Sequence, residues 1–445
     1  MLLDNWLAQR AETCPDRPAI VTGAGSIDYA QLEAEASAMA RRLSAKGVRR
    51  GSVAAIAMAP GLEYATVLHA LMKLGATAFP LDPRLASEER QRAIGPRLPA
   101  IIVEGPDDLA GHEADMPLLG ELDLDAPFTR ILTSGTSGAS RAIEHTYGNH
   151  LWSAVGSAFN LGVDPDDRWL CCVPLFHVSG VSILMRSAIY GTTAVVQDGF
   201  DLDRVAESLQ SDGITIVSLV TTMLTRLIDA GAAIERPRAI LVGGGPVPDE
   251  ILEEALGLGA TVVQTYGLTE TASQVTTLSP ADASRKRGSA GRPLLTTHVR
   301  IADGEIRVQG PTVAPEALSE DGWLHTGDCG SIDSEGFLWV EGRLDDVIVT
   351  GGENVAPEEV EQVRASHPDV REAAVVGRPD PNWQNAVVAV LVANETAEPD
   401  RDSLRSWCAA RLAPYKVPKS FELVAELPRT SSGKVRRSEL RQPTR

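Results

Sequence analysis

The chain has 445 residues, of which 43% are hydrophobic and 4% aromatic, and its formal net charge at pH 7 is −19. That length is enough for about two to four domains. The negative charge argues against nucleic acid and against an anionic membrane surface as the main partner, because both attract basic proteins.

The first half of the chain alternates apolar strands with amphipathic helices. The predicted helices cover residues 2–13, 29–45, 63–74, 150–159, 182–190 and 202–211. The predicted strands cover residues 19–22, 53–58, 76–80, 100–103, 168–173, 193–196, 214–220, 239–242 and 261–264. Strands and helices that alternate at this spacing predict an α/β fold with a mostly parallel sheet.

The pattern changes near residue 290 to short alternating strands, such as 299–301 and 305–308, which are typical of a small antiparallel unit. A compact α+β segment follows, with helices over 357–366 and 402–412 and strands over 373–376 and 387–392. We therefore predict an N-terminal domain of residues 1–344 and a C-terminal domain of residues 345–445.

The five cysteines form no C-x-x-C pair. Their odd number favours a reducing compartment without a zinc site or a disulfide framework. The N-terminus has no signal-peptide pattern, and no segment approaches about 18 consecutive apolar residues. We expect a cytoplasmic protein without a membrane span.

One loop combines glycine with hydroxyl side chains directly after an apolar pair. Residues 132–141 are L-T-S-G-T-S-G-A-S-R. Glycines allow a tight turn with inward N–H groups, and the hydroxyls add donors, so the loop favours an anion such as phosphate. It lacks the Lys-Ser or Lys-Thr of a Walker A loop. An ordinary surface loop remains an alternative for this segment taken alone.

Two further polar segments follow predicted strands, namely G-G-G-P at 243–246 and T-Y-G-L-T-E at 265–270. Ligands in open α/β sheets bind beyond the carboxyl ends of the strands. These two segments and the glycine loop are therefore predicted to converge on one site.

Six motifs in a fixed order carry a resemblance over nearly the whole chain. They are T-S-G-T-S-G (133–138), G-G-G-P (243–246), Y-G-L-T-E (266–270), H-T-G-D (325–328), G-R-L-D-D (342–346) and P-R-T-S-S-G-K (428–434). In these motifs the chain resembles the adenylate-forming superfamily of acyl-CoA ligases, luciferases and peptide-synthetase adenylation domains. The resemblance implies a large N-terminal domain of stacked mixed sheets with helices, a small β-barrel-like subdomain, and a small mobile C-terminal domain.

The resemblance also implies the chemistry and the substrates. Such enzymes use ATP and Mg²⁺ to convert a carboxylic acid into an acyl-adenylate, and a thiol, here coenzyme A, then displaces AMP. The implied ATP-binding residues are Thr133, Ser134, Gly135, Thr136, Ser137, Gly138, Arg141, Gly243, Gly244, Gly245, Thr265, Tyr266, Gly267, Asp328 and Arg343.

Within this set the roles differ. The glycine loop would wrap the β- and γ-phosphates. Tyr266 would pack on adenine, with the backbone of Gly243–Gly245 opposite. Asp328 would accept both ribose hydroxyls, since an ionised carboxylate can take two hydrogen bonds. Arg343 would contact ribose or phosphate.

The resemblance assigns catalysis to Lys434, Glu270, Thr269 and His177. Glu270 would help to hold Mg²⁺, with Thr269 near the phosphates. The flexible cation of Lys434 would reach the carboxylate and the α-phosphate. An ordinary helix-start carboxylate is the alternative for Glu270, and a solvated lysine is the alternative for Lys434.

Three more positions concern the movement of the C-terminal domain and the entry of the thiol. Asp345 matches the hinge of the superfamily. Gly351 and Gly352 would line the approach of CoA, because only glycine leaves room beside a backbone. The glycine loop departs from the usual Pro-Lys-Gly continuation and has Arg141 there, which keeps the charge but not the shape.

The acyl pocket is predicted around His177, Ser179 and Arg186. Arg186 interrupts the apolar stretch 181–189, and a buried guanidinium needs an anionic partner. A structural Asp or Glu could serve, and so could a second carboxylate on the substrate. For His177, a packed, hydrogen-bonded histidine is the alternative.

The substrate class remains open at this stage. A ligase of an acid with two carboxylates, a general aryl- or medium-chain acyl-CoA ligase, and a stand-alone adenylation enzyme that loads a carrier protein all fit the motifs. A nucleotide-binding protein without catalysis fits less well, because Glu270, Asp328, Arg343 and Lys434 are all present. The expected partners are small molecules, and a homo-oligomer is left open.

Overall fold

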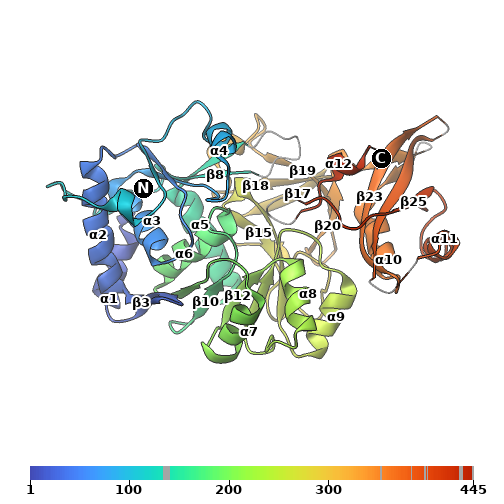
Figure 1. The fold of residues 1–445 in the computed structure, drawn as a ribbon, viewed down its shortest axis with the longest axis horizontal. Coiled ribbons are helices and arrows are strands. Elements are labelled where there is room, and N and C mark those ends of the chain that lie inside the picture. The colour runs from blue at the N-terminus through green and yellow to red at the C-terminus, as the bar shows by residue number, and fades with distance from the viewer. Residues whose placement is uncertain are drawn as a thin grey trace.

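The computed structural model describes residues 1–133, 141–350, 353–381, 383–394, 397, 399–429 and 434–442. In these residues the strands form five sheets. Figure 1 shows most of the chain as one large body, with the segment from β23 to α12 at the right-hand end.

The largest sheet has nine strands in the order β16-β15-β14-β13-β12-β10-β11-β2-β3. Their bounds are β2 (Pro18–Thr22), β3 (Gly25–Asp28), β10 (Arg168–Cys171), β11 (Thr193–Val196), β12 (Ile216–Leu219), β13 (Ala239–Val242), β14 (Val262–Leu268), β15 (Ser273–Thr277) and β16 (Arg292–Pro293). The six strands from β2 to β14 run parallel, and β3, β15 and β16 add antiparallel edges.

A second sheet has the order β6-β4-β5-β8-β9, and a separate pair joins β1 to β7. Their bounds are β1 (Leu2–Asp4), β4 (Val53–Ile56), β5 (Thr77–Pro80), β6 (Ile101–Val103), β7 (Glu121–Asp123), β8 (Pro127–Leu132) and β9 (Ala142–Thr146). β8 and β9 are antiparallel, so the glycine loop connects two strands of a hairpin.

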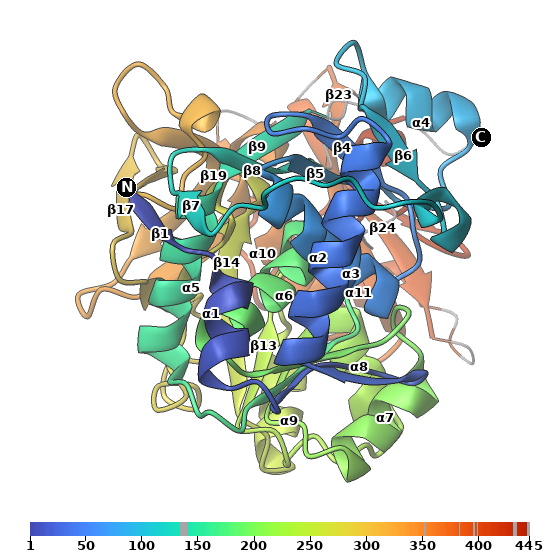
Figure 2. The same ribbon diagram turned by 90° about the vertical axis from the view of Figure 1, so that its left-hand side faces the viewer.

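Helices fill the space between the two sheets. Five of them share one hydrophobic core with β4 and β12: α1 (Trp6–Thr13), α2 (Tyr29–Ala45), α3 (Leu62–Leu74), α5 (Tyr147–Leu161) and α6 (Val178–Tyr190). Figure 2 shows α2 and α3 packed side by side in this layer. Successive side chains of β10 point to opposite faces of the sheet, as this layered fold requires. Trp169 belongs to this core, and Leu170 belongs to the core on the other face.

The outer faces of the sheets carry the remaining helices of the large body. α7 (Leu202–Ser211), α8 (Thr221–Asp229) and α9 (Asp249–Gly257) cover the large sheet, and α4 (Ser87–Ile94) lies beside the second one. A four-stranded antiparallel sheet follows in the chain. It consists of β17 (His298–Ala302), β18 (Glu305–Gln309), β19 (Leu324–Ile332) and β20 (Leu338–Arg343).

The chain after residue 346 has its own sheet and its own core. Its elements are β21 (Ile348–Thr350), β22 (Glu353–Val355), α10 (Pro357–Ala365), β23 (Val370–Asp380), β24 (Gln384–Ala393), α11 (Arg401–Ala409), β25 (Ser420–Leu423) and α12 (Arg437–Leu440). Along β23 and β24, alternate residues pack on opposite faces, for example Val375 on one face and Val376 on the other. Four 3-10 helices complete the described elements: η1 (Pro106–Leu109), η2 (Thr269–Thr271), η3 (Pro315–Ala317) and η4 (Leu344–Asp346).

The predicted α/β fold class is confirmed, and the local differences have physical reasons. Residues 2–4 were expected in a helix but form β1, because they pair with β7, more than a hundred residues away. The segment Y-G-L (266–268) was expected as a turn but belongs to β14. A bulge between Tyr266 and Gly267 shifts the register there, and the pairing with β15 continues to Leu268. Tertiary pairing thus overrides the local pattern at both places.

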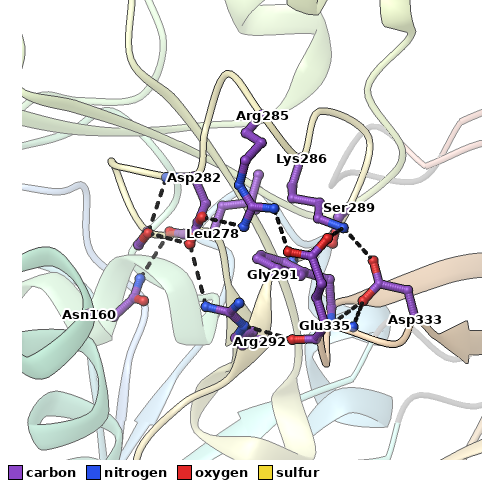
Figure 3. Close-up of polar contacts among 12 residues, drawn as sticks. Asn160, Leu278, Asp282, Arg285, Lys286, Ser289, Gly291, Arg292, Asp333 and Glu335 are labelled. Carbon is purple, nitrogen blue, oxygen red and sulfur yellow. Dashed lines mark hydrogen bonds and ion pairs between the residues drawn. The ribbon is translucent and has the colours of Figure 1, made fainter.

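A charged cluster fastens residues 279–292 to the turn after β19 (Figure 3). Lys286 Nζ lies 2.8 Å from Asp333 Oδ2, and Arg292 Nε donates to the Glu335 carbonyl at 3.0 Å. These contacts hold the connection between β15 and β16 in place. Basic and acidic side chains pair with one another here, so the cluster stabilises the fold and offers no net charge to a ligand.

Within the described part of the chain, no helix has both the length and the apolar character needed to cross a membrane.

Candidate active site

The glycine loop emerges from the β8–β9 hairpin, and its two described ends are close together. The Thr133 N–H donates to the Arg141 carbonyl at 2.7 Å, and the Thr133 hydroxyl donates to the same oxygen at 3.1 Å. The guanidinium of Arg141 donates to the Glu316 carbonyl at 3.2 Å. The other predicted loop residues, Ser134, Gly135, Thr136, Ser137 and Gly138, lie outside the described residues.

Glu270 and Thr269 lie in η2, directly after β14. The Glu270 carbonyl accepts a hydrogen bond from the Ala314 N–H at 2.8 Å. The backbone then turns through Ala272 and Ser273, whose φ angles are +49° and +105°. Two consecutive residues with side chains at positive φ are strained and need firm support from their surroundings.

Tyr266, Asp328 and Arg343 form one hydrogen-bonded group, although they come from three strands. The Tyr266 hydroxyl donates to Asp328 Oδ2 at 2.7 Å, and Arg343 Nη1 donates to Oδ1 at 2.9 Å. Asp328 and Arg343 are direct partners in the β19–β20 pairing. Burial, and next the Asp328 charge, raise the pKa of Tyr266 well above its usual value, so this hydroxyl stays a donor.

Close backbone packing surrounds this group. Gly243 follows β13, and a Cβ there would lie 2.8 Å from the Thr265 methyl group. Gly244 has a φ of +87°, which suits only glycine. At Gly267 a Cβ would lie 1.7 Å from the Ser273 carbonyl oxygen. The chain beside Tyr266 therefore passes through narrow gaps that side chains would block. Gly245 adjoins Gly244 in the same connection, and no atom of the described residues lies within 4 Å of a Cβ placed there.

Arg186 lies inside the molecule on α6 and is 2% exposed. Its Nη2 donates to Ser153 Oγ at 3.1 Å, and its guanidinium carbon lies 5.5 Å from the centre of the Trp169 ring. Its Nε has no hydrogen-bond partner among the described residues. Burial lowers its pKa. No described carboxylate forms an ion pair with it, so the alternative of a structural Asp or Glu partner finds no support among those residues.

His177 precedes α6, and its ring packs on Phe176 with the ring centres 4.6 Å apart. Its Nε2 is buried, and no described residue forms a hydrogen bond with it, which does not match the packed, hydrogen-bonded histidine of the alternative explanation. Ser179 is half-buried in the first turn of the same helix. A Cβ at Gly180 would lie 2.4 Å from the Pro174 carbonyl oxygen, so glycine lets this turn approach the preceding loop.

Lys434 belongs to the C-terminal segment, and its charge affects the pKa of His177. Burial lowers the pKa of His177 to about 4. The negative charge of Asp82 opposes this effect, and the positive charges of Lys434 and Arg84 add to it.

The hinge and the CoA channel are described only in part. Asp345 lies in η4, but its side chain is outside the description, and so are Gly351 and Gly352. The neighbouring Asp346 accepts hydrogen bonds from Arg437 Nη1 at 3.2 Å and from Arg441 Nη2 at 2.9 Å. Arg437 is therefore a structural residue at the end of the lysine segment.

The residues around η2 fit a magnesium ion held together with a nucleotide. The described part of the chain contains no group of three or more His, Cys, Asp or Glu side chains that could hold a metal by itself. Mg²⁺ needs no such cage, because in nucleotide sites it binds one or two carboxylates together with substrate phosphates and water. Glu270 is half-buried and lies close to the glycine-loop hairpin, because the neighbouring Thr269 contacts His145 of β9. Its carboxylate is the kind of oxygen ligand that Mg²⁺ binds in nucleotide sites.

The residues that hold η2 were not among those predicted from the sequence. His145 Nε2 lies 2.6 Å from the Thr269 carbonyl oxygen, and Ser153 donates to the Ala272 carbonyl at 2.8 Å. His145 is fully buried, but its strand A-I-E-H-T is mixed polar and apolar, so there was no clear signal for it in the sequence. Nothing in the sequence indicated Ser153.

Comparisons with known proteins agree with this architecture. Residues 7–116 and 104–316 match the family model of the AMP-binding enzyme, and residues 359–434 match its C-terminal domain. The chain is 40% identical, over 475 residues, to the 2-succinylbenzoate–CoA ligase of Bacillus cereus, and the match covers 99% of this chain and 98% of that protein.

Solved structures give the same result. The o-succinylbenzoate CoA synthetase of Bacillus subtilis, in complex with its acyl-adenylate intermediate, matches with a TM-score of 0.93 and 37% identity, over 100% of this chain and 99% of that chain. A double mutant of that synthetase bound with its product analogue matches over the same lengths with a TM-score of 0.74. The chain described here belongs to the AMP-binding enzyme family.

Proposed function

We propose that this member of the AMP-binding enzyme family joins 2-succinylbenzoate to coenzyme A through an acyl-adenylate, the ligation that belongs to menaquinone biosynthesis. Three segments of the sequence indicate this substrate, namely P-L-F-H-V-S-G (174–180), L-M-R (184–186) and T-Y-G-L-T-E-T-A-S-Q (265–274). The names of the Bacillus relatives support the same substrate.

The observation that carries the choice of acid is the environment of Arg186. A guanidinium keeps its charge in proteins, and a buried charge is stable only when an anion and hydrogen bonds compensate it. The described residues supply one hydroxyl, from Ser153, and one aromatic face, from Trp169. A second carboxylate on the substrate would complete this environment, whereas a monocarboxylic acid would leave the guanidinium unpaired.

The site residues support adenylation as follows. The Tyr266, Asp328 and Arg343 group would hold the ribose, since each Asp328 oxygen has a further lone pair beyond the one already used. Glu270 and the phosphates would hold Mg²⁺, which supplies neutralisation of the triphosphate charge. Lys434 would bridge the reacting carboxylate and the α-phosphate, where negative charge moves as pyrophosphate leaves.

In the first half-reaction a carboxylate oxygen bonds to the α-phosphorus, and the bond to pyrophosphate breaks. In the second, the CoA sulfur bonds to the acyl carbon, AMP leaves with the electron pair, and the thiol proton passes to solvent. His177 borders the place where the acyl group would lie. Its low pKa keeps the ring neutral at working pH, so it adds no positive charge to the pocket.

We propose that residues 1–344 and 345–445 are the two units that move between these half-reactions, with Asp345 as hinge and with Gly351 and Gly352 beside the thiol. Two observations support this division. The strands after residue 346 form their own sheet and core. The TM-scores against the Bacillus subtilis synthetase differ, 0.93 for its acyl-adenylate complex and 0.74 for its complex with the product analogue.

The test is AMP release with ATP, Mg²⁺ and CoA across 2-succinylbenzoate, benzoate, cinnamate and octanoate. Strong preference for 2-succinylbenzoate is the expected result. Equal turnover of the monocarboxylic acids would keep the ligase chemistry and discard the substrate, in favour of a general acyl-CoA ligase. Adenylate formation without transfer to CoA would point to a carrier protein as the acceptor.

A further inference from the structure

The short helix η2, which carries Glu270, is held from both ends by buried polar side chains that the adenylation chemistry described above does not use. At its start the Thr269 carbonyl accepts from His145 at 2.6 Å. At its end the Ala272 carbonyl accepts from Ser153 at 2.8 Å. Glu270 lies between these two fixed carbonyls, so the position of its carboxylate depends on both.

We infer that His145 is a positioning residue for Glu270, which acts on adenylation by fixing η2 and touches no substrate itself. The inference rests on the proposed adenylation function. His145 lies in β9 and is fully buried. It is only four residues after Arg141, the last residue of the glycine loop. The same hairpin thus carries the phosphate loop and the side chain that holds η2.

A chain of hydrogen bonds fixes which nitrogen of His145 carries the proton. A carbonyl oxygen can only accept, so His145 Nε2 must donate to Thr269. His145 Nδ1 is then the acceptor and receives the Thr129 hydroxyl at 3.2 Å. The Thr129 oxygen in turn receives the Nε2–H of His150 at 2.7 Å. Each donor has one acceptor, and the order of the bonds leaves only one tautomer for His145.

Burial keeps this arrangement uncharged. It lowers the pKa of His145 to about 4, and burial together with the charges of His145 and Arg186 lowers the pKa of His150 well below its usual value. A neutral ring can donate through one nitrogen and accept through the other, which a protonated ring cannot do. The support under Thr269 is therefore constant across the working pH range.

The other end of η2 leads to the acyl pocket. Ser153 donates to the Ala272 carbonyl and accepts from Arg186 Nη2 at 3.1 Å. Ala272 and Ser273 are the residues with positive φ, so this hydrogen bond stabilises a strained turn. One helix, α5, supplies both His150 and Ser153. The two ends of η2 are thereby linked to the same helix, directly through Ser153 and indirectly through His145 and Thr129 to His150.

The test compares His145→Leu with His145→Gln in the two half-reactions, using 2-succinylbenzoate and its synthetic acyl-adenylate. Glutamine places an N–H donor near the position of Nε2, and leucine does not. For His145→Leu we expect about a 30-fold loss of kcat in ATP–pyrophosphate exchange and a raised Mg²⁺ requirement, since a displaced catalytic group lowers the rate by such amounts. Transfer to CoA from supplied acyl-adenylate should stay within about twofold, and His145→Gln should recover most of the exchange rate.

Two further variants keep the result interpretable. Thr129→Val removes the hydroxyl that donates to His145 Nδ1 and changes little volume. It should show the same difference between the two half-reactions, and it serves as the test if His145→Leu does not fold. His69→Leu is the matched control, because His69 is also buried, with its pKa lowered to about 4 by burial. His69 lies on α3. The variant His69→Leu should lower the melting temperature without changing the Mg²⁺ requirement.

The outcomes separate this inference from the proposed function. An equal loss of both half-reactions in His145→Leu, or an unchanged Mg²⁺ requirement in both His145→Leu and Thr129→Val, would overturn the positioning role. Failure of the unmodified protein to exchange pyrophosphate with 2-succinylbenzoate would instead overturn the proposed substrate.

Discussion

The hydroxyl of Tyr266 donates a hydrogen bond to Asp328 Oδ2 at 2.7 Å, and so joins β14 to β19. Arg343 binds the other oxygen of the same carboxylate at 2.9 Å. The carboxylate proposed to bind the ribose therefore has a fixed orientation before any nucleotide arrives. A preorganised acceptor loses less entropy on binding than a mobile one.

Tyr266→Phe should weaken ATP binding. A hydrogen bond to a charged group contributes about 1.5–3 kcal/mol, so we expect the KM for ATP to rise about 10-fold. The KM for the acid should change little. Tyr147→Phe is the control, because Tyr147 is buried and its hydroxyl donates to the Met72 carbonyl at 3.2 Å, away from this group. Steady-state kinetics in ATP and acid would check both variants.

Arg186→Met should remove the proposed partner of the second carboxylate. We expect the KM for 2-succinylbenzoate to rise about 100-fold, since a buried charged hydrogen bond is lost, while the KM for ATP stays normal. The control is Arg364→Met, which changes a fully buried arginine of the C-terminal segment that donates to the Leu404 carbonyl. An equal effect of Arg186→Met on benzoate would contradict the dicarboxylate assignment.

Lys434→Ala should separate the half-reactions. Adenylation should fall by about three orders of magnitude, because the variant loses the charge that stabilises the transition state. Thioester formation from supplied acyl-adenylate should be largely spared. Lys416→Ala, which removes a lysine paired with Glu359 on the same part of the chain, should leave both steps unchanged. Rapid-quench measurement of adenylate and thioester would distinguish the two steps, and an equal loss in both would exclude the two-conformation scheme.

Glu358 should make stability depend on pH. Its carboxylate lies against Gly342 and pairs with Arg437 at 2.8 Å, and burial raises its pKa from 4.5 to about 7. The folded state then binds more protons than the unfolded state between these values, so this group makes stability fall as pH rises from 4.5 to about 7.

Glu358→Gln removes that titration. The free energy of unfolding of the variant relative to the unmodified protein should therefore grow over the same pH window, by about 1–3 kcal/mol, and stay constant above it. Urea unfolding at pH 5, 6, 7 and 8 would measure the difference. A difference that shrinks as pH rises would contradict the raised pKa.

The sequence determined much of this protein because its motifs are local. The glycine loop, Tyr266, Glu270, Asp328, Arg343 and Lys434 each stand in a short motif. The order of these motifs along the chain carries the resemblance to the superfamily, and that resemblance implies their roles. The helix predicted over 29–45 matches α2 because capping residues and apolar periodicity are also local, and Asp28 and Gln31 form its capping box.

Tertiary structure decided the contacts between distant residues. His145 meets Thr269 across 124 positions, and Ser153 meets Ala272 across 119. No periodicity or spacing encodes such a pair, because it depends on how two sheets pack. The same holds for Arg186, whose burial could be predicted but whose lack of a carboxylate partner among the described residues required all its neighbours to be placed. Local patterns thus specify which groups the chemistry uses, and packing specifies what holds them in position.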